Sequence, residues 1–247
     1  MSTHHDATVS TPGAANAPLT LDAVPERIRI RPVASYRHID FRIHVAPRQD
    51  IPTTDRTPVT LALVLDRSGS MSGEKLATAK RAAAEVLSRL DERDTFAAVV
   101  FDSQIDVVQQ AAPATPQIKA RAIAALNAVE ARASTALHDG WLTGCQAIAS
   151  DSPIVRGRDL ARCFLLTDGI ANVGETDPER IASKAADVRE HTGISTSTFG
   201  IGDDYQEHLL APMAVAGAGQ FHHLRSAADI AHALPGELGS ALAAVAS

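Results

Sequence analysis

The stretch Leu61-Ala-Leu-Val-Leu65 runs directly into Asp66-Arg67-Ser68-Gly69-Ser70. The five apolar residues predict a buried strand, and the loop that follows carries one carboxylate and two hydroxyls. Oxygen atoms of this kind are the ligands that Mg²⁺ prefers, and Mg²⁺ takes few carboxylates and keeps several waters. The stretch therefore predicts a strand whose exit loop binds a hard divalent cation.

Beyond Pro58, apolar segments alternate with longer segments of helical periodicity. This alternation predicts a parallel sheet with helices on both faces. The link between Phe101 and Ile105 is too short for a crossover helix, so that pair of strands should be antiparallel. We therefore expect an α/β fold, Rossmann-like and doubly wound, with a mostly parallel six-stranded sheet and one antiparallel edge strand. The expected strands are 61–65, 95–101, 105–110, 163–167, 195–201 and 220–224, and the expected helices are 74–90, 116–129, 136–150, 178–191, 205–216 and 227–245.

The region before this alternation predicts two further parts. Residues 1–22 are rich in Ala, Thr, Ser and Pro without periodicity, which is typical of a disordered tail. Residues 23–58 should form a β-hairpin and a linker, because apolar residues recur at period two around Ile28 and Ile30 and again from Ile39 to Val45. The predicted organisation is a tail at 1–22, a hairpin and linker at 23–58, and a main domain at 59–247.

Composition excludes several classes of protein. The 247 residues carry a formal net charge of −6 and no cluster of Lys and Arg, so a nucleic-acid partner is not expected. No apolar run approaches the ~18 residues of a membrane span, and residues 1–10 lack the pattern of a secretory signal. Cys145 and Cys163 are too few for a disulfide framework. We therefore expect a cytoplasmic protein with no membrane span.

Three polar segments should meet at one edge of the sheet. Ligands of open α/β sheets collect at the carboxyl ends of the strands, near the point where strand order reverses. The loop that starts at Asp66, the pair Ser134-Thr135, and Thr167-Asp168-Gly169 all suit this edge. Two carboxylates placed there without a partner would be costly, and a shared cation would relieve both.

These segments resemble the metal-ion-dependent adhesion site (MIDAS) of von Willebrand factor type A domains, which has the pattern D-x-S-x-S plus a distant Thr and Asp. The resemblance covers about residues 59–247 and is strongest with bacterial stand-alone members. It implies a bound Mg²⁺, with Mn²⁺ or Ca²⁺ as alternatives. The metal ligands that it implies are Asp66, Ser68, Ser70, Thr135 and Asp168.

Two positions bear on how closely the pattern is followed. The family often has glycine before its threonine, whereas this chain has Ala133-Ser134, so the Thr135 loop is expected to be stiffer. Arg67 occupies a variable position between two ligands, and its side chain is expected to point to solvent.

The main functional hypothesis is a non-enzymatic binding module, in which the metal captures an Asp or Glu side chain of a partner protein. The resemblance further implies partners of the AAA-type ATPase class, or a kinase and phosphatase system, and allows the last helix to move with metal occupancy. The alternative is a metal-assisted phosphohydrolase with Asp66 as nucleophile. That alternative is disfavoured because such enzymes have the pattern D-x-D at this point, with the second Asp as general acid. This chain has Ser68 there, and a serine hydroxyl lacks a suitable pKa for that role.

Other conspicuous residues are interpreted structurally. Trp141 and both cysteines are expected in the core. His222 and His223 are adjacent on a strand, so they should face opposite sides of the sheet and not share a metal. The N-terminal strands either fold over the main domain or recruit another chain by strand addition.

Overall fold

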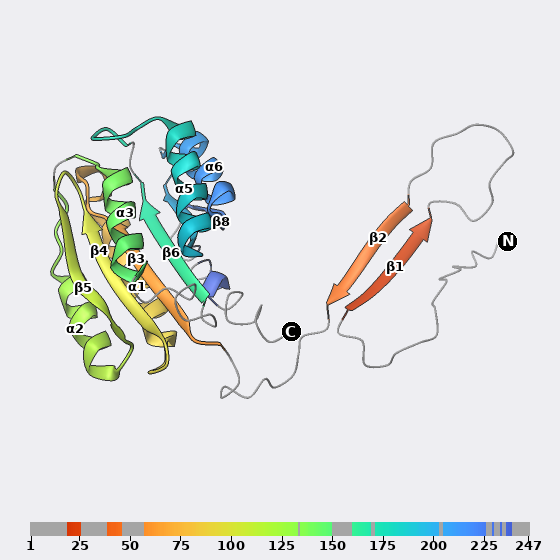
Figure 1. The fold of residues 1–247 in the computed structure, drawn as a ribbon, viewed down its shortest axis with the longest axis horizontal. Helices are drawn as coiled ribbons and strands as arrows, with labels where there is room; N and C mark the ends of the chain where they lie inside the picture. The colour runs from red at the N-terminus through yellow and green to blue at the C-terminus, as the bar shows by residue number, and fades with distance from the viewer. Residues whose placement is uncertain are drawn as a thin grey trace, which may run out of the picture. The chain divides into compact units, whose positions relative to one another are not determined.

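The computed structural model describes residues 19–25, 39–45, 57–132, 134–149, 160–168, 171–202, 205–225, 229, 233 and 236–238. The chain forms two compact units, residues 1–54 and 55–247 (Figure 1).

The first unit contains a two-stranded antiparallel sheet. Strand β1 (Leu19–Pro25) pairs with β2 (Ile39–Val45), with Leu19 opposite Val45. Strand β2 confirms the strand predicted from Ile39 to Val45. The expected strand around Ile28 and Ile30 lies outside the described residues, and β1 begins inside the segment predicted to be disordered through residue 22. That boundary was wrong because the alternation Leu19-Thr-Leu-Asp is short and is hidden in the average composition of the tail.

The second unit is built on a six-stranded sheet, as predicted. Its order is β5-β4-β3-β6-β7-β8, and every neighbouring pair is parallel except β4 and β5. The strand order reverses between β3 and β6. The strands are β3 (Val59–Asp66), β4 (Thr95–Phe101), β5 (Ile105–Pro113), β6 (Leu160–Thr167), β7 (Ser195–Ile201) and β8 (Ala218–Leu224).

Helices cover both faces of this sheet (Figure 1). On one face lie α1 (Glu74–Arg89) and α2 (Pro116–Asn127). On the other lie α3 (Leu137–Ala149), α5 (Pro178–Thr192) and α6 (Glu207–Ala216). Of the helix expected at 227–245, residues 229, 233 and 236–238 are helical and the rest lies outside the described part.

Local sequence explains where these helices begin and end. The Asp177 side chain accepts hydrogen bonds from the amides of Glu179 and Arg180, and Pro178 occupies the first turn of α5, where an amide proton would have no partner. Gly193 ends α5 at φ +71°, a left-handed conformation that favours glycine.

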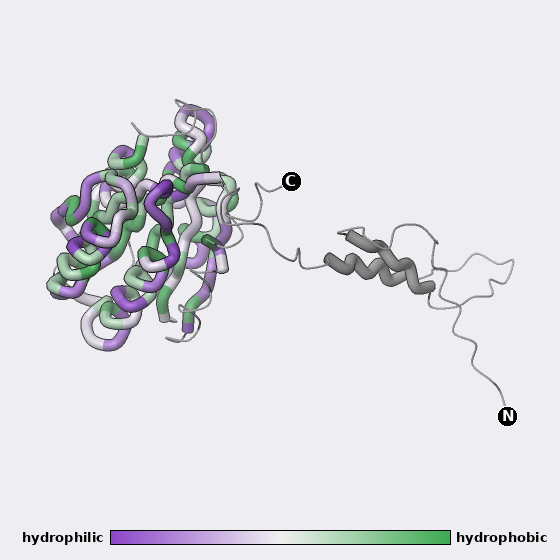
Figure 2. The backbone as a smooth tube through the Cα atoms, turned by 90° about the horizontal axis from the view of Figure 1, so that it is seen from below, coloured by the Kyte–Doolittle hydropathy of each residue, from purple (hydrophilic) through white to green (hydrophobic). Residues whose placement is uncertain are grey.

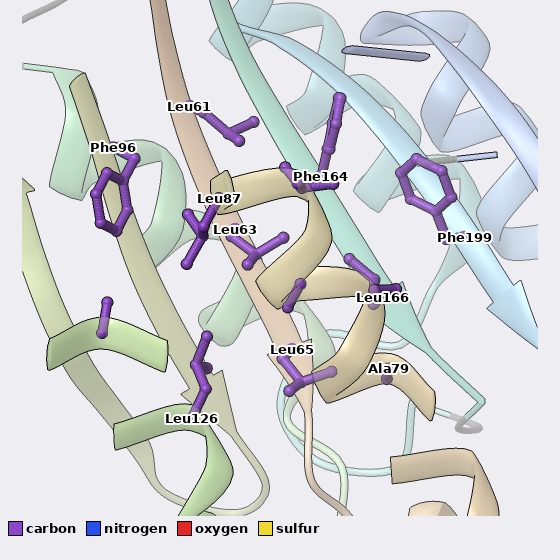
Figure 3. Packing of buried hydrophobic residues seen from close by; sticks show 14 of the residues in the cluster. Leu61, Leu63, Leu65, Ala79, Leu87, Phe96, Leu126, Phe164, Leu166 and Phe199 are labelled. Carbon is purple, nitrogen blue, oxygen red and sulfur yellow. The ribbon is translucent and has the colours of Figure 1, made fainter. Parts of the chain in front are cut away.

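The alternation of side chains along β3 divides the core into two clusters. Leu61, Leu63 and Leu65 pack against α1 and against Leu126 of α2, and all are buried (Figure 3). Ala62 and Val64 face α3 instead. Full burial of one such leucine contributes about 1.5–3 kcal/mol. Hydrophobic and hydrophilic residues both occur along the helices, as expected for helices with one buried face (Figure 2).

Two glycines let α3 approach the sheet closely. A Cβ on Gly144 would lie 2.2 Å from Cγ2 of Val64, and one on Gly140 would lie 2.4 Å from the Phe101 ring. The absence of side chains at these positions fixes the start of α3, and therefore Thr135, near the carboxyl ends of β3 and β4.

Candidate metal site

The candidate site lies where the strand order of the sheet reverses. Asp66 is the last residue of β3, and Asp168 directly follows β6, the parallel neighbour of β3. Both residues are buried, with exposed fractions of 0% and 3%. Two carboxylates are thus held out of water at the edge of the sheet where ligands of this architecture collect.

Both oxygens of Asp66 accept hydrogen bonds. Oδ1 accepts from the amide of Ser68 at 2.7 Å, and Oδ2 accepts from Oγ1 of Thr167 at 2.5 Å. Burial raises the pKa of Asp66 to about 6, although hydrogen bonds from Thr167 and Ser68 act in the opposite direction. The hydrogen bonds therefore do not fully offset the cost of burying the ionised carboxylate, and a bound cation would lower its pKa.

A series of hydrogen bonds joins the two acidic residues, starting with the Ser68 amide that donates to Asp66. The hydroxyls of Ser68 and Ser70 lie 3.1 Å apart, and the Ser70 hydroxyl donates to Oδ1 of Asp168 at 2.8 Å. Oδ2 of Asp168 accepts from the ammonium of Lys75 at 2.5 Å. Four of the five residues expected from the sequence are thus linked through their own contacts.

The fifth residue, Thr135, is held by its backbone to the segment that follows Asp168. Its amide donates to Oδ1 of Asn172 at 2.9 Å, and its carbonyl accepts from the amides of Asn172 and Val173 at 3.2 Å each. On the other side, the Arg132 amide donates to the Arg67 carbonyl at 2.8 Å. Thr135 is 3% exposed; its own contacts hold it against the segment after Asp168, and the bond to the Asp66 loop is made by Arg132, three residues earlier.

The expectation that Arg67 points to solvent was wrong. The residue is 7% exposed, and its Nε and Nη2 lie 3.0 Å from Asp102 and 2.5 Å from Asp106. The cause is the β4–β5 hairpin, which places a buried carboxylate directly beside the Asp66 loop.

Asp102 links the two loops that flank the site. Its carboxylate accepts from Nε of Arg67 at 3.0 Å, from Nε of Arg132 at 2.6 Å, and from the Gln104 amide at 2.6 Å. Its carbonyl accepts from the Ala136 amide at 2.8 Å. Burial raises the pKa of Asp102, but the Gln104 amide and the two guanidinium groups outweigh burial and hold it below its ordinary value.

The residues at this edge fit a hard divalent cation. In the described part of the chain, no three His, Cys, Asp or Glu side chains gather as a metal cluster. The donor set therefore consists of two carboxylates and several hydroxyls, all of them oxygen, which suits Mg²⁺ better than a metal that prefers nitrogen or sulfur.

Four residues outside the expected ligand set shape this site. Thr167 bonds Asp66, Lys75 bonds Asp168, Asn172 holds Thr135, and Asp102 holds Arg67. Thr167 belongs to the Thr167-Asp168-Gly169 segment expected at this edge, although no role was predicted for it. The other three contacts depend on tertiary placement and have no local sequence signal.

The remaining conspicuous residues lie where they were expected. Trp141 is fully buried and donates to the Thr196 hydroxyl, and both cysteines are buried and free. His222 stacks on Phe199, whereas His223 bonds the Gly202 carbonyl, so the two rings do not converge. None of the helices in the described ranges combines the length and apolar character needed to cross a bilayer.

Comparison with known proteins identifies a matching family model. The model of the von Willebrand factor type A domain matches residues 60–234. An uncharacterised protein of Synechocystis sp. is 31% identical over 197 residues, which are 78% of this chain and 43% of that protein. The human inter-alpha-trypsin inhibitor heavy chain H3 is 29% identical over 184 residues, 72% of this chain and 20% of the relative. The chain thus spans less than half the length of these relatives.

Solved structures share the fold. A von Willebrand factor type A protein from Catenulispora acidiphila superposes with a TM-score of 0.65 at 20% identity, covering 93% of this chain and 47% of that one. The proximal thread matrix protein 1 of the mussel byssus, in a structure with a zinc-occupied MIDAS motif, gives a TM-score of 0.59 at 19% identity, covering 76% and 46%.

Proposed function

Because the chain belongs to the von Willebrand factor type A domain family, we propose that it is a metal-dependent protein-binding module that captures an acidic side chain of a partner protein. Domains of this family generally serve as interaction modules, and the MIDAS of the family binds a divalent metal. For this chain we propose which residues hold the metal, which metal they hold and which chemical group of the partner the metal captures.

The observation that carries the proposal is the series of hydrogen bonds from Asp66 through Ser68 and Ser70 to Asp168. We assign the metal to these four residues and to Thr135. Two carboxylates formally balance the charge of a divalent metal, and the three hydroxyl ligands are neutral and weak donors, so the bound metal would remain a Lewis acid. It would supply an electrophilic anchor for a carboxylate from outside, which is worth more in a partly dry cleft than a surface ion pair of about 0–1 kcal/mol.

Mg²⁺ is the proposed cation, with Mn²⁺ or Ca²⁺ as alternatives. The all-oxygen donor set supports this choice. The zinc-occupied motif of the mussel byssus protein supports occupancy of such a site by a divalent cation. Calorimetry of the purified chain with each of these cations tests the proposal, and an absence of binding in all of them would exclude it.

The proposed partner presents Asp or Glu to the metal. Family resemblance allows a partner of the AAA-type ATPase class or of a kinase and phosphatase system, without choosing between them. A pull-down from lysate with the immobilised chain, in Mg²⁺ and in EDTA, tests the metal requirement. We expect capture in Mg²⁺ alone, and loss of capture in Ser70→Ala. Ser88→Ala is the matched control, since the Ser88 hydroxyl donates to a carbonyl within α1.

Capture that persists in EDTA, or that survives Ser70→Ala unchanged, would exclude metal-dependent recognition. Two synthetic peptides from the captured partner, identical except for Glu or Gln at one position, then test whether the chain recognises the carboxylate itself. We expect the Glu peptide to bind in Mg²⁺ and the Gln peptide to fail.

The phosphohydrolase alternative lacks a general acid. Such an enzyme needs a group of suitable pKa two residues after the nucleophile to protonate the leaving group, and Ser68 cannot supply it. Assay of p-nitrophenyl phosphate hydrolysis with Mg²⁺ separates the two classes, and we expect no turnover above the Asp66→Asn variant.

The domain limits and the location of the protein stay predictions. We propose that residues 59–247 form the binding domain. We propose that the β1–β2 pair recruits another chain or folds over the domain. Removal of residues 1–50 followed by measurement of solution mass tests whether this pair recruits another chain. The cytoplasmic location rests on cysteine usage and is tested by cell fractionation.

A further inference from the structure

A lysine is already paired with one of the proposed metal ligands. Nζ of Lys75, the second residue of α1, lies 2.5 Å from Oδ2 of Asp168, and the carboxylate side chain has no exposed surface. The other oxygen of Asp168 accepts from the Ser70 hydroxyl. The ammonium therefore supplies a positive charge at the same edge where the divalent cation is proposed to bind.

The two ends of this ion pair differ in their freedom to move. The Asp168 side chain is 0% exposed, whereas the Lys75 side chain is 34% exposed. The tip of the lysine lies against Gly202, where an added Cβ would be 3.1 Å from Cε and 3.3 Å from Nζ. A long side chain with an open path to water can leave this position by rotation about its own bonds, but the buried carboxylate cannot follow it.

We infer that Lys75 is an internal counter-ion of the metal site: it holds Asp168 in place without metal and is displaced from Oδ2 when a divalent cation binds. This inference rests on the proposed function, because it concerns the same five ligands. It adds a role that the D-x-S-x-S pattern does not contain. Lys75 acts here as a positioning residue and sets how tightly the metal is held.

Electrostatics decides the direction of the effect. The site carries two carboxylates, and Lys75 balances one of them through Asp168. A divalent cation that arrives must compete with this ammonium for Oδ2 and is repelled by it at short range. Removal of the lysine charge therefore strengthens metal binding, whereas a lysine that merely supported the ligand geometry would weaken metal binding when removed.

Calorimetry of Mg²⁺ and Mn²⁺ binding to the full chain measures this competition. Lys75→Met keeps the aliphatic chain and removes the charge, and we expect it to tighten metal binding by about tenfold or more. Lys75→Arg keeps the charge and should stay near the wild type. The matched control is Lys184→Met on α5, which makes the same change of net charge at an exposed position and should alter affinity by about twofold or less.

The metal-free protein provides a second readout. Without metal, Lys75→Met leaves a buried carboxylate unpaired, so its melting temperature in EDTA should fall below that of the wild type. Saturating Mg²⁺ should close this gap, since the cation replaces the ammonium in both proteins. A gap that stays equal in EDTA and in Mg²⁺ would overturn the inference.

The wild-type chain can be tested without any variant. Acetylation of lysines by a water-soluble reagent, read residue by residue by mass spectrometry, reports whether the Lys75 amine is engaged. We expect Mg²⁺ to increase the modification rate of Lys75 severalfold and to leave that of Lys184 unchanged. A rate for Lys75 that falls or stays constant in Mg²⁺ would overturn the inference.

The outcomes separate this inference from the function on which it rests. If the wild type binds Mg²⁺ and Lys75→Met binds it equally or more weakly, the counter-ion role is refuted and the metal-dependent module stands. If neither protein binds any divalent cation, the proposed function is refuted, and the counter-ion role with it.

Discussion

Nε of Arg67 donates to Oδ2 of Asp102 at 3.0 Å, joining the exit loop of β3 to the β4–β5 hairpin. The same carboxylate oxygen accepts from Arg132, and the Asp102 carbonyl accepts from the amide of Ala136, the residue after Thr135. One buried acidic residue thus couples the two loops that carry proposed metal ligands.

Asp102→Asn should destabilise the protein by about 2–4 kcal/mol, because it leaves the buried Arg67 guanidinium without a full counter-charge. Urea denaturation measures the loss. Asp106→Asn is the matched control: its side chain is 53% exposed, so its ion pair with Arg67 should contribute about 1 kcal/mol or less. Equal losses in the two variants would mean that burial of Asp102 does not govern the strength of this network.

Asp66→Asn should stabilise the metal-free protein at neutral pH. Burial raises the pKa of Asp66 from 3.8 to about 6 in the folded state, so the folded protein binds the proton more tightly than the unfolded chain. The contribution of this group to stability is therefore complete below pH about 4 and is lost as the pH rises through about 6. The loss above that window is about 3 kcal/mol, and the neutral Asn escapes it.

The measurement is the free energy of unfolding in EDTA, compared between wild type and variant from pH 4 to pH 7. The gap should be small near pH 4 and should widen up to pH about 6. Exposed Asp187→Asn controls for the loss of one negative charge. A gap that stays constant over this range would contradict the raised pKa of Asp66.

Mg²⁺ should raise the melting temperature of the wild type, because a cation that binds only the folded state stabilises it. At a concentration one hundred times Kd, the gain is about 2.7 kcal/mol. Ser70→Ala removes both a proposed ligand and the hydroxyl that bonds Asp168, so the gain should largely disappear. Differential scanning fluorimetry of both proteins, with Ser88→Ala as control, decides this. The same shift in wild type and Ser70→Ala would place the metal elsewhere.

Three central strands of the main sheet were predictable because apolar runs mark them. Strands β3, β4 and β6 are buried along nearly their whole length, and burial on both faces favours continuous apolar sequence. Strand β7 is equally buried although it opens with Ser195-Thr-Ser-Thr198, and the Thr198 hydroxyl there donates to the Leu210 carbonyl. The edge strand β5 runs to Pro113, beyond the expected Gln110. Its mixed burial leaves no sharp boundary in the sequence.

The convergence of Asp66 and Asp168 was predictable from topology, since β3 and β6 are parallel neighbours where the strand order reverses. The burial of Arg67 was not predictable. It depends on the β4–β5 hairpin, whose pairing places Asp102 beside a loop that is 35 residues away in sequence. The contact of Lys75 with Asp168 spans 93 residues and likewise depends on tertiary placement, here of α1 beside the end of β6.

Gly144→Ala should destabilise the protein by about 1–3 kcal/mol through overpacking of α3 against β3. The added methyl group would lie 2.2 Å from Cγ2 of Val64, and both the helix and the buried strand resist the shift. Val64→Ala alone opens a cavity and should cost about 2 kcal/mol. The double variant should be more stable than the sum of the two losses predicts, with a coupling of about 1 kcal/mol, because the truncated side chain makes room for the new methyl.

Urea denaturation of the four proteins completes this double-mutant cycle. Gly236→Ala is the control, since an added methyl there meets no atom within 4 Å and the residue is helical, so stability should stay constant or rise by up to about 1 kcal/mol. A shift of α3 would also move Thr135, which lies two residues before the helix, so Mg²⁺ affinity should fall in Gly144→Ala and recover in the double variant. Strictly additive losses would show that the close approach of α3 to β3 does not position the threonine.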